Sequence, residues 1–323
     1  MQDATAVSRR STLADYIAIA RPDNWTKNFF MLPGAALAFV VDDQVQASAL
    51  PALAAGIIST CLVASANYTI NEYLDAEFDR HHPTKSQRPT ALGRIQGKYV
   101  VVQYLLLAAV GLGIASLLHP VFFYGSVALL VMGILYNVAP IRTKDRVFID
   151  VLSESVNNPI RLLLGWAAVS SIVVPPVSVL LSYWMGGAYL MAIKRYAEYR
   201  MIGDPERAGR YRRSFRYYTE ERLLLSAFFY ALTSALFLGI FLIKYKVEFI
   251  ISFPFFALLF VWYLKISLAP KSTAINPEKL YLEPRFLGYV GFLVVLVVAL
   301  FYFDIPALHY LMDHSASQDA RIE

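Results

Sequence analysis

Charged residues and cysteine are both scarce in this 323-residue chain. Only 16% of its residues are Asp, Glu, Lys or Arg, whereas soluble domains carry about a quarter. The single cysteine, Cys61, lies inside an apolar run, which excludes a disulfide framework and a cysteine-based metal site within the chain. Residues 1–20 contain no long apolar segment, so we expect no cleavable signal peptide. These shortages argue against a soluble domain and against a disulfide-stabilised one.

Hydrophobic residues are abundant instead, and they occur in long runs. They make up 57% of the chain, and the runs show neither the alternation of a strand nor the narrow stripe of a soluble helix. Because a helix satisfies its own backbone hydrogen bonds in a bilayer, such runs predict an all-α, polytopic membrane protein. We expect nine transmembrane helices, at Phe29–Val41, Ser48–Tyr68, Tyr99–Leu118, Val121–Ala139, Val151–Val169, Val177–Ile193, Leu223–Ile243, Phe249–Leu268 and Phe286–Phe303.

Basic residues are concentrated on one side of the membrane in this predicted topology. All but four of the 29 Lys and Arg residues fall in the N-terminal segment or in the loops that follow every second span. By the positive-inside rule, the N-terminus is cytoplasmic and the C-terminus is extracytoplasmic. We therefore divide the chain into a cytoplasmic segment (1–28), a nine-helix catalytic domain (29–303) and a short outer tail (304–323). The net charge of +5 reflects this topology, so no nucleic-acid partner is expected.

A polar stripe follows the second predicted span. Asn67, Asn71, Asp75 and Asp79 recur at every fourth residue, so a helix would place them on one face. A divalent cation would relieve the repulsion between stacked carboxylates, and Mg²⁺ commonly binds one or two carboxylates together with phosphate oxygens. We interpret Asp75 and Asp79, with Asn71, as a metal and phosphate site. The alternative is a helix end with solvated acids, which we prefer for Glu77, since it lies off the stripe.

The loop after the stripe carries basic groups suited to an anionic, metal-bound ligand. Lys85 and Arg88 are candidates for phosphate contacts, although ordinary positive-inside charge would also explain them. His81 and His82 are expected on the loop surface rather than at a metal. The basic run Arg207–Arg216 is interpreted as a surface that attracts anionic lipid head groups.

Three further clusters are expected to face the same cytoplasmic-side cavity. Lys27 and Asn28 lead directly into the first span, and Arg161 enters the fifth, where an arginine is expensive unless it faces a polar interior. The third cluster ends the sixth span. One interpretation is a second substrate-binding wall. The other is that Lys194 and Glu198, which are four positions apart, form a pair on the helix surface. The sequence of the cluster is Lys194-Arg195-Tyr196-Ala197-Glu198.

These motifs together resemble the UbiA superfamily of intramembrane prenyltransferases, which have a nine-helix bundle, a cytoplasmic-side active site and a carboxylate motif after helix two. Within it, the chain is similar to the decaprenyl-phosphate phosphoribosyltransferase branch. Asp150 and Arg161 fall where that branch has Asp and Arg. The closer similarity lies in Arg21-Pro22-x-x-Trp25-x-Lys27-Asn28, Asn71-x-x-x-Asp75-x-x-x-Asp79-Arg80-x-His82-Pro83-Thr84-Lys85-x-x-Arg88-Pro89 and Lys194-Arg195-Tyr196-Ala197-Glu198.

The resemblance implies a Mg²⁺-dependent pentosyl transfer in the inner membrane of a bacterium. The 5-phosphoribosyl group of phosphoribosyl pyrophosphate would move to a polyprenyl (decaprenyl) phosphate and release pyrophosphate, feeding a lipid-linked pentose donor for a cell-envelope glycan. Asp75 and Asp79, with Asn71, would hold Mg²⁺, and Glu198 or Asp150 would stabilise positive charge at the ribose C1. The substrate-binding residues would be Lys27, Asn28, Asn71, Lys85, Arg88, Arg161, Lys194, Arg195 and Tyr196.

Two other functions stay open at this point. An aromatic prenyltransferase using a polyprenyl diphosphate would share the fold and the first motif. Such relatives, however, have a second paired-aspartate motif where this chain has one carboxylate and two bases. Glu72 also stands where family members often have Asp. A non-enzymatic polyprenyl-lipid transporter would show repeats and charges near the membrane midplane, whereas the polar residues here gather at one face. The sequence leaves prenyl chain length and homo-oligomerisation open.

Overall fold

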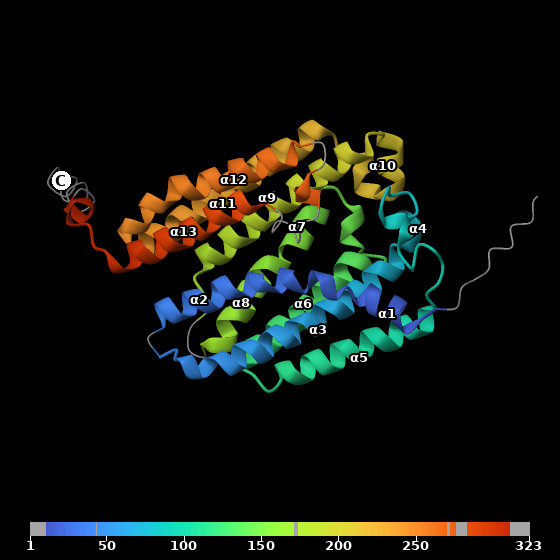
Figure 1. The fold of residues 1–323 in the computed structure, drawn as a ribbon, viewed down its shortest axis with the longest axis horizontal. Coiled ribbons are helices and arrows are strands. Elements are labelled where there is room, and N and C mark those ends of the chain that lie inside the picture. Colours follow the sequence, from blue (N-terminus) through green and yellow to red (C-terminus); the bar gives the residue numbers. More distant parts are fainter. Residues whose placement is uncertain (1–10, 43, 171–173, 270–271, 276–282, 311–323) are drawn as a thin grey trace, which may run out of the picture.

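The computed structural model describes residues 11–42, 44–170, 174–269, 272–275 and 283–310. Within these ranges the chain is helical and contains no β-strand, which confirms the all-α prediction. The long helices lie side by side in an elongated bundle (Figure 1). The predicted outer tail and cytoplasmic segment are described only in part, because residues 311–323 and 1–10 lie outside these ranges.

Seven helices form the body of the bundle: α3 (Leu50–Leu74), α5 (Gly97–Ala115), α6 (Pro120–Asn137), α9 (Val177–Ile202), α11 (Glu220–Tyr245), α12 (Phe253–Ser267) and α13 (Pro284–Tyr302). The shorter α-helices are α1 (Leu13–Ala20), α2 (Leu32–Val41), α4 (Ala76–Asp79), α7 (Ile149–Ser155), α8 (Asn157–Val169) and α10 (Pro205–Tyr211). Short 3₁₀ helices join them: η1 (Pro22–Met31), η2 (Ala47–Ala49), η3 (Lys85–Gln87), η4 (Thr143–Asp145), η5 (Arg213–Arg216), η6 (Val247–Ser252) and η7 (Thr273–Ile275).

Seven helical stretches in the described part of the chain are long and apolar enough to cross a membrane. They coincide with predicted spans two, three, four, six, seven, eight and nine. The first predicted span falls on η1 and the short α2, and the fifth is divided at Val156 into α7 and α8. Pro159 stands in the first turn of α8, where its missing N–H favours a new helix start over continuation of α7. Nine crossings therefore stay a prediction.

Glycine lets the two shorter spans approach each other closely. A Cβ on Gly34 of α2 would lie 1.9 Å from the carbonyl oxygen of Leu162. A Cβ on Gly165 of α8 would lie 1.8 Å from the carbonyl oxygen of Met31. Small residues allow this backbone approach within a membrane bundle. The crossing brings η1 against α8 and so places the polar residues of η1 beside Arg161.

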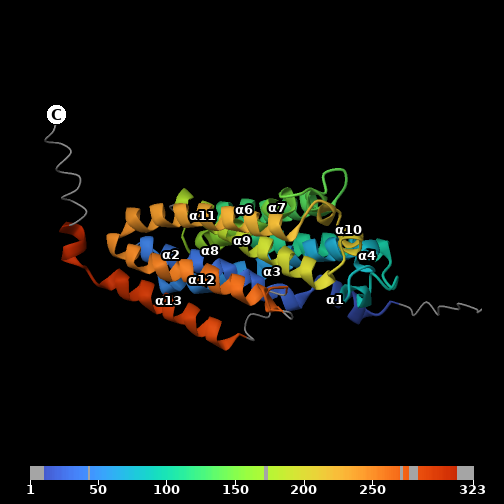
Figure 2. The same ribbon diagram turned by 90° about the horizontal axis from the view of Figure 1, so that it is seen from above.

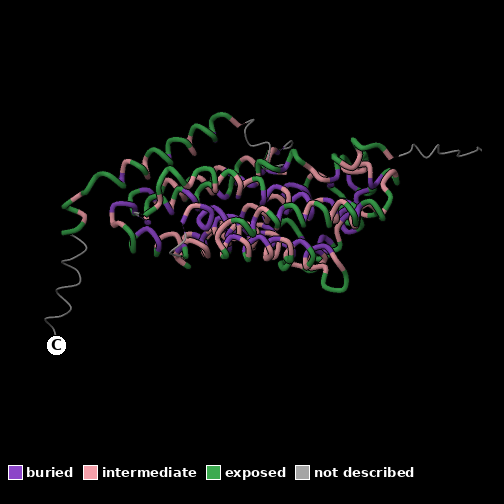
Figure 3. Tube along the Cα trace, turned by 90° about the horizontal axis from the view of Figure 1, so that it is seen from below, coloured by how far each residue is buried: buried purple, intermediate pink, exposed green. Residues whose placement is uncertain are grey.

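The short polar elements gather at one end of the bundle. Figure 1 shows α4 and α10 together at the end where α3 and α9 finish, and Figure 2 shows the same pairing from above. Buried residues lie mainly inside the bundle, whereas much of α13 is exposed (Figure 3). Large apolar side chains such as Leu106 and Val295 point outward, at 62% and 67% exposure. An apolar exterior of this kind suits contact with lipid chains.

Candidate functional site

The acidic stripe is continuous through the end of α3. The backbone N–H of Asp75 donates to the carbonyl of Asn71 over 3.0 Å, and that of Asp79 donates to the carbonyl of Asp75 over 2.8 Å. These helical bonds keep the three residues on one face, although α3 itself ends at Leu74. The helix extends beyond the span end predicted at Tyr68, because the polar stretch that follows is amphipathic and still packs on one side.

The stripe reaches two separate cavities. Asn71 lines an inner cavity of about 140 Å³ between η1, α3, α6, α8 and α9. Asp75 and Asp79 line an outer cavity of about 20 Å³ beneath α10 and η4. The three predicted metal ligands therefore do not share one cavity. In the described part of the chain, no three His, Cys, Asp or Glu side chains are grouped closely enough to form a metal site on their own.

Cations and amides line the inner cavity. Among the predicted substrate-binding residues, Lys27, Arg161 and Lys194 all face it. The carboxamide oxygen of Asn157 is buried there without a hydrogen-bond partner in the described structure. The other polar lining residues include Asn67, Asn137, Asn158, Glu154, Tyr68 and Tyr136. Three cations from three different elements, with amides between them, form a pocket suited to an anionic group.

Asn28 is fully buried and does not line the inner cavity. Its Oδ1 accepts a hydrogen bond from Nε of Arg161 over 3.0 Å, and its Nδ2 donates to Sγ of Cys61 over 3.2 Å. The side chain thus fixes the guanidinium that does face the cavity. We assign Asn28 as a positioning residue for Arg161.

Two basic residues from the loop between α6 and α7 hold Asp75. Lys144 Nζ lies 2.5 Å and Arg142 NH2 lies 2.8 Å from its Oδ1. Burial alone would raise the pKa of Asp75, but Lys144 and Arg142 hold it below its ordinary value. Burial lowers the pKa of Lys144 to about 8, against the opposing effect of Asp75. Sequence reasoning read both bases only as positive-inside charge and missed their place in the site.

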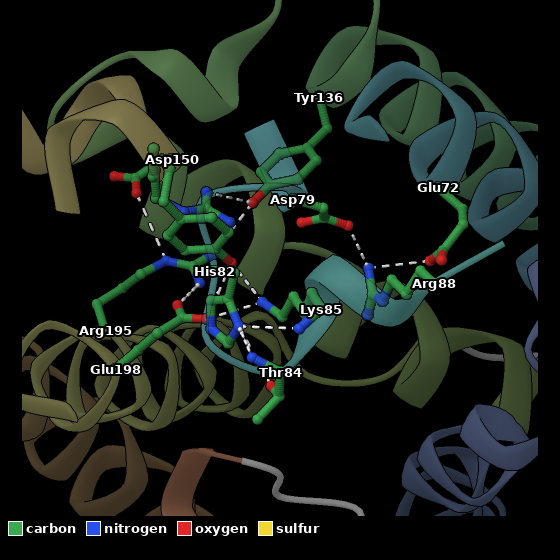
Figure 4. A network of polar contacts seen from close by, with 12 residues as sticks. Glu72, Asp79, His82, Thr84, Lys85, Arg88, Tyr136, Asp150, Arg195 and Glu198 are labelled. Atoms are coloured by element: carbon green, nitrogen blue, oxygen red, sulfur yellow. Dashed lines mark hydrogen bonds and ion pairs between the residues drawn. The ribbon is translucent and has the colours of Figure 1, made fainter. Parts of the chain in front are cut away.

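Arg88 bridges two carboxylates on the other side of the stripe. Its NH1 lies 2.8 Å from Oδ2 of Asp79 and 3.0 Å from Oε2 of Glu72 (Figure 4). Burial raises the pKa of Asp79, and the charges of Arg88 and Lys85 only partly oppose that rise. Glu72 therefore serves here as an ion-pair partner of Arg88.

Glu198 lies near the end of α9, in the predicted second substrate-binding wall, and has no exposed surface. Its Oε1 accepts from Lys85 Nζ at 2.7 Å and from the Tyr211 hydroxyl at 2.9 Å, and its Oε2 lies 3.1 Å from Arg195 NH1. Figure 4 shows Glu198, Lys85 and Arg195 converging. Lys85 comes from a loop more than a hundred positions away in sequence. The suggested surface pair of Lys194 with Glu198 is wrong, because Glu198 is fully buried; Lys194 lines the inner cavity.

The expectation that His82 lies on the loop surface is also wrong. His82 is 2% exposed, and its Nδ1 accepts from the backbone N–H groups of Thr84 and Lys85, each over 3.2 Å. Its Nε2 lies 3.4 Å from Oε1 of Glu198. Burial lowers the pKa of His82 despite the carboxylate nearby. The ring folds the loop so that Lys85 reaches Glu198. His81 is exposed, as predicted.

Asp150 lies in the first turn of α7 and is likewise fully buried. It accepts from the hydroxyls of Tyr218 (2.7 Å) and Ser214 (3.1 Å). Arg195 Nε lies 3.7 Å from it, so this arginine connects Asp150 with Glu198. Tyr196 is buried in the apolar cluster that contains Tyr211 and Phe215, and it lines neither cavity.

The basic run Arg207–Arg216 faces in two directions. Arg212 is half-buried and lines the outer cavity. The other arginines of the run are exposed, which agrees with the predicted surface for lipid head groups. NH1 of Arg212 lies 3.4 Å from the hydroxyl of Tyr136. Arg212 and Tyr211 were missed as site residues, since nothing in a run of closely spaced arginines shows which one points inward.

Comparison with known proteins decides the family. The sequence matches the UbiA prenyltransferase family over residues 29–283. The chain belongs to this family. As a UbiA-family member it is an enzyme of the prenyltransferase type, which disfavours the transporter hypothesis. It is 31% identical to a decaprenyl-phosphate phosphoribosyltransferase of Mycolicibacterium smegmatis over 233 residues, covering 68% of this chain and 67% of the relative.

Other relatives act on different substrates. A protoheme IX farnesyltransferase of Alkalihalophilus pseudofirmus is 27% identical over 197 residues, which cover 59% of this chain and 62% of that protein. Among solved structures, a UbiA homologue from Archaeoglobus fulgidus bound to DMAPP and Mg²⁺ superposes with a TM-score of 0.66 at 19% identity. The superposition covers 89% of this chain and 99% of the homologue. This likeness shows the UbiA fold.

Proposed function

We propose that this UbiA-family enzyme transfers the 5-phosphoribosyl group of phosphoribosyl pyrophosphate to a polyprenyl phosphate, such as decaprenyl phosphate, and releases pyrophosphate. The main support is the wall formed by Lys85, Arg195 and Glu198. Both oxygens of Glu198 are already occupied by these bases and by Tyr211. Such a wall offers no free carboxylate pair for a second metal-bound diphosphate. Its partly exposed cation, Lys85, would contact a phosphate of a sugar donor.

Mg²⁺ fits the outer cavity by the chemistry of its lining. Carboxylate oxygens are its usual protein ligands, alongside substrate phosphate oxygens. The outer cavity, about 20 Å³ in volume, is lined by the carboxylates Asp75, Asp79 and Asp145 and by the cations Arg142, Lys144 and Arg212. Among the described residues, contacts reach only Oδ1 of Asp75 and Oδ2 of Asp79. Asp75 and Asp79 would hold the ion, whereas Asn71, the third predicted ligand, lines the inner cavity. Bound there, Mg²⁺ would neutralise charge on the departing pyrophosphate.

The bases around the two cavities would orient the phosphates. Arg88 and Lys144 already lie at the two carboxylates, and Lys85 lies on the facing wall. In the inner cavity, Arg161 and Lys194 come from different helices and would hold a second phosphate-bearing group. The acceptor phosphate is anionic at neutral pH, so no strong general base is required. Positioning and fixed positive charge would supply most of the catalysis.

The cellular location is part of the same proposal. We infer that the end of the bundle with α4 and α10 faces the cytoplasm of a bacterial cell, with the N-terminus on that side and the C-terminus outside. A water-soluble phosphosugar donor would enter from the cytoplasm, and the polyprenyl tail would lie among the helices. The product would be a lipid-linked pentose phosphate for cell-envelope glycan synthesis.

The relationship to protoheme IX farnesyltransferase favours one competing function, prenyl transfer from a polyprenyl diphosphate to an aromatic acceptor. Transfer of label from phosphoribosyl pyrophosphate to polyprenyl phosphate separates the two. We expect label in the lipid phase with Mg²⁺, none with EDTA, and none in Asp75→Asn. Glu77→Gln, an exposed carboxylate in the next turn, is the matched control and should stay active. A folded sample that transfers only a prenyl group to an aromatic acceptor would overturn the proposal.

A further inference from the structure

A third cavity opens on the outer surface of the bundle, between α12 and α13. At about 580 Å³ it is larger than the inner or the outer cavity, and it shares no lining residue with either. Its walls are largely apolar, with Leu258, Val261, Trp262 and Ile266 from α12 and Phe286 from α13. Figures 2 and 3 show α13 at the edge of the bundle, with its beginning standing away from the other helices. We call this cavity the α12–α13 wedge.

Aromatic side chains fix the width of the wedge. Trp262 packs against Phe286 and Tyr289, with ring centroids 6.2 and 5.4 Å apart. The hydroxyl of Tyr289 donates to the carbonyl of Phe255 over 2.9 Å. These contacts join α12 to α13 through bulky rings rather than small residues, so the helix backbones stay apart. The wedge is therefore built into the packing of the two helices.

Charged residues stand at the mouth of the wedge. Lys265 lies in the last turn of α12 and Arg285 in the first turn of α13, and both side chains are exposed. No described residue forms an ion pair with either base. Glu283 also lines the mouth, and its Oε1 accepts from the hydroxyl of Thr273 over 3.1 Å. Arg285 places a cation at the N-terminus of α13, which is the positive end of that helix dipole. A bound anion would stabilise both positive charges.

We propose that the α12–α13 wedge binds an anionic phospholipid, with an acyl chain along the apolar walls and the head-group phosphate between Lys265 and Arg285. Basic pockets between transmembrane helices are known head-group sites for anionic lipids. The wedge opens toward the lipid-facing surface, where such an occupant is always available. The proposal does not depend on the identity of the transferase substrates.

The charge balance at the mouth selects among lipids. Among the described lining residues, two cations and one carboxylate leave a net charge of about one positive unit. A phosphodiester such as phosphatidylglycerol carries one negative charge and balances it. A phosphate monoester carries about −1.5 to −2 at neutral pH, and phosphatidylethanolamine carries no net charge. A polyprenyl phosphate or a zwitterionic lipid is therefore a poorer electrostatic match.

Quenching of Trp262 by lipids with brominated acyl chains measures occupancy directly. The full-length chain is reconstituted into phosphatidylcholine nanodiscs containing increasing fractions of brominated phosphatidylglycerol or brominated phosphatidylcholine. The chain has four tryptophans, so the Trp262 signal is obtained by subtracting the emission of Trp262→Phe. We expect half-maximal quenching of Trp262 at a much lower fraction of phosphatidylglycerol than of phosphatidylcholine.

Removal of the two cations should abolish this preference. Each basic residue near an anionic lipid surface strengthens binding by about 5-fold, so Lys265→Ala/Arg285→Ala should weaken phosphatidylglycerol binding by about 25-fold. The charge-preserving variant Lys265→Arg/Arg285→Lys should retain it. Lys98→Ala/Arg146→Ala, which removes two exposed basic residues outside the wedge, is the matched control and should quench as the unmodified chain does.

Four outcomes would overturn the proposal. Equal quenching by the two brominated lipids would show no head-group preference, and an unchanged preference in Lys265→Ala/Arg285→Ala would place the lipid elsewhere. Unlabelled polyprenyl phosphate that restores fluorescence more effectively than unlabelled phosphatidylglycerol would reassign the wedge to that lipid. A preference for phosphatidylethanolamine would show that Glu283, rather than the two bases, decides the selection.

Discussion

Two pairs of carboxylates face each other at the charged end of the bundle, and their surroundings differ. In the pair Glu198 and Asp150, protein groups contact both oxygens of each side chain, and neither side chain has exposed surface. In the pair Asp75 and Asp79, contacts from the described residues reach only one oxygen of each, and both line the outer cavity. Among the residues that the structure describes, the second pair alone has a carboxylate oxygen without a protein contact.

This difference assigns different tasks to residues that the sequence grouped together as catalytic candidates. A buried ion pair adds little net stability, but removal of one partner leaves an uncompensated charge in a nonpolar environment. Glu198 and Asp150 therefore hold Arg195 and Lys85 in place. Asp75 and Asp79 remain the candidates for direct contact with metal or substrate. The predictions below test this division, beginning with the largest expected effect.

Glu198→Ala should produce the largest loss of stability. It would remove the carboxylate of the partly buried Lys85 and leave the buried Arg195 with Asp150 alone, and breaking a buried pair typically costs about 3–5 kcal/mol. Thermal or denaturant unfolding in detergent measures this loss. Glu220→Ala on α11 is the control, because its pairing with Arg200 is exposed and 3.6 Å long, so about 1 kcal/mol or less is expected. A Glu198→Ala protein of normal stability and no activity would make Glu198 catalytic and remove the distinction between the pairs.

Asp79→Asn should instead reduce activity while leaving most of the stability intact. A side chain that stabilises transition-state charge typically contributes about 10²–10³-fold to kcat, and we expect a loss of that size in label transfer. The isosteric amide keeps a hydrogen-bond acceptor for Arg88, whose NH1 also contacts Glu72. If Asp79→Asn unfolds as readily as Glu198→Ala, then Asp79 belongs with the structural pair.

Asn28→Ala should have a smaller effect, seen in KM rather than kcat. A hydrogen bond to a charged group contributes about 1.5–3 kcal/mol, and its loss frees the Arg161 guanidinium to leave its place in the inner cavity. The KM for the substrate held there should rise about 10- to 100-fold, since 1.4 kcal/mol corresponds to a factor of ten. Cys61→Ser is the control, because a hydroxyl can still accept from Asn28. An equal rise in Cys61→Ser would show general disruption of the buried cluster.

Much of the fold followed from local features of the sequence. Seven predicted spans match helices because long apolar runs have few other ways to satisfy their backbone. The four-residue spacing of Asn71, Asp75 and Asp79 correctly predicted one helical face, as their backbone hydrogen bonds show. The ends of α3 and α9 were placed too early, because amphipathic turns beyond a span lack the uniform hydrophobicity by which spans are recognised.

The missing site residues depend on contacts between distant segments. Arg142 lies 67 positions from Asp75, and only the connection from α6 to α7 brings the two together. In the sequence, Arg142 and Lys144 cannot be distinguished from ordinary cytoplasmic charge. The burial of His82 likewise depends on α9 and α10 packing over its loop. No local pattern of residues signals a polar side chain that becomes buried only through tertiary packing.

The smallest predicted effect concerns His82, which lies beside the structural pair. Burial lowers its pKa, so the folded protein binds a proton there less readily than the unfolded chain, whose histidine titrates near about 6.5. The unfolded state then takes up more protons as the pH falls, and stability decreases below about pH 6.5. In His82→Asn, the amide oxygen can still accept from the N–H groups of Thr84 and Lys85 but does not titrate. The melting temperature of this variant should therefore fall less than that of the unmodified chain between about pH 7 and pH 5.

His81→Asn provides the matched control for this measurement, since His81 is the adjacent exposed histidine. Its melting temperature should show the same pH dependence as the unmodified chain. If His82→Asn also shows an unchanged dependence, the ring does not become harder to protonate on folding. Glu198, 3.4 Å from its Nε2, would then offset the effect of burial. His82 and Glu198 would in that case form a charged pair, and Glu198 would hold three cationic partners in place of two.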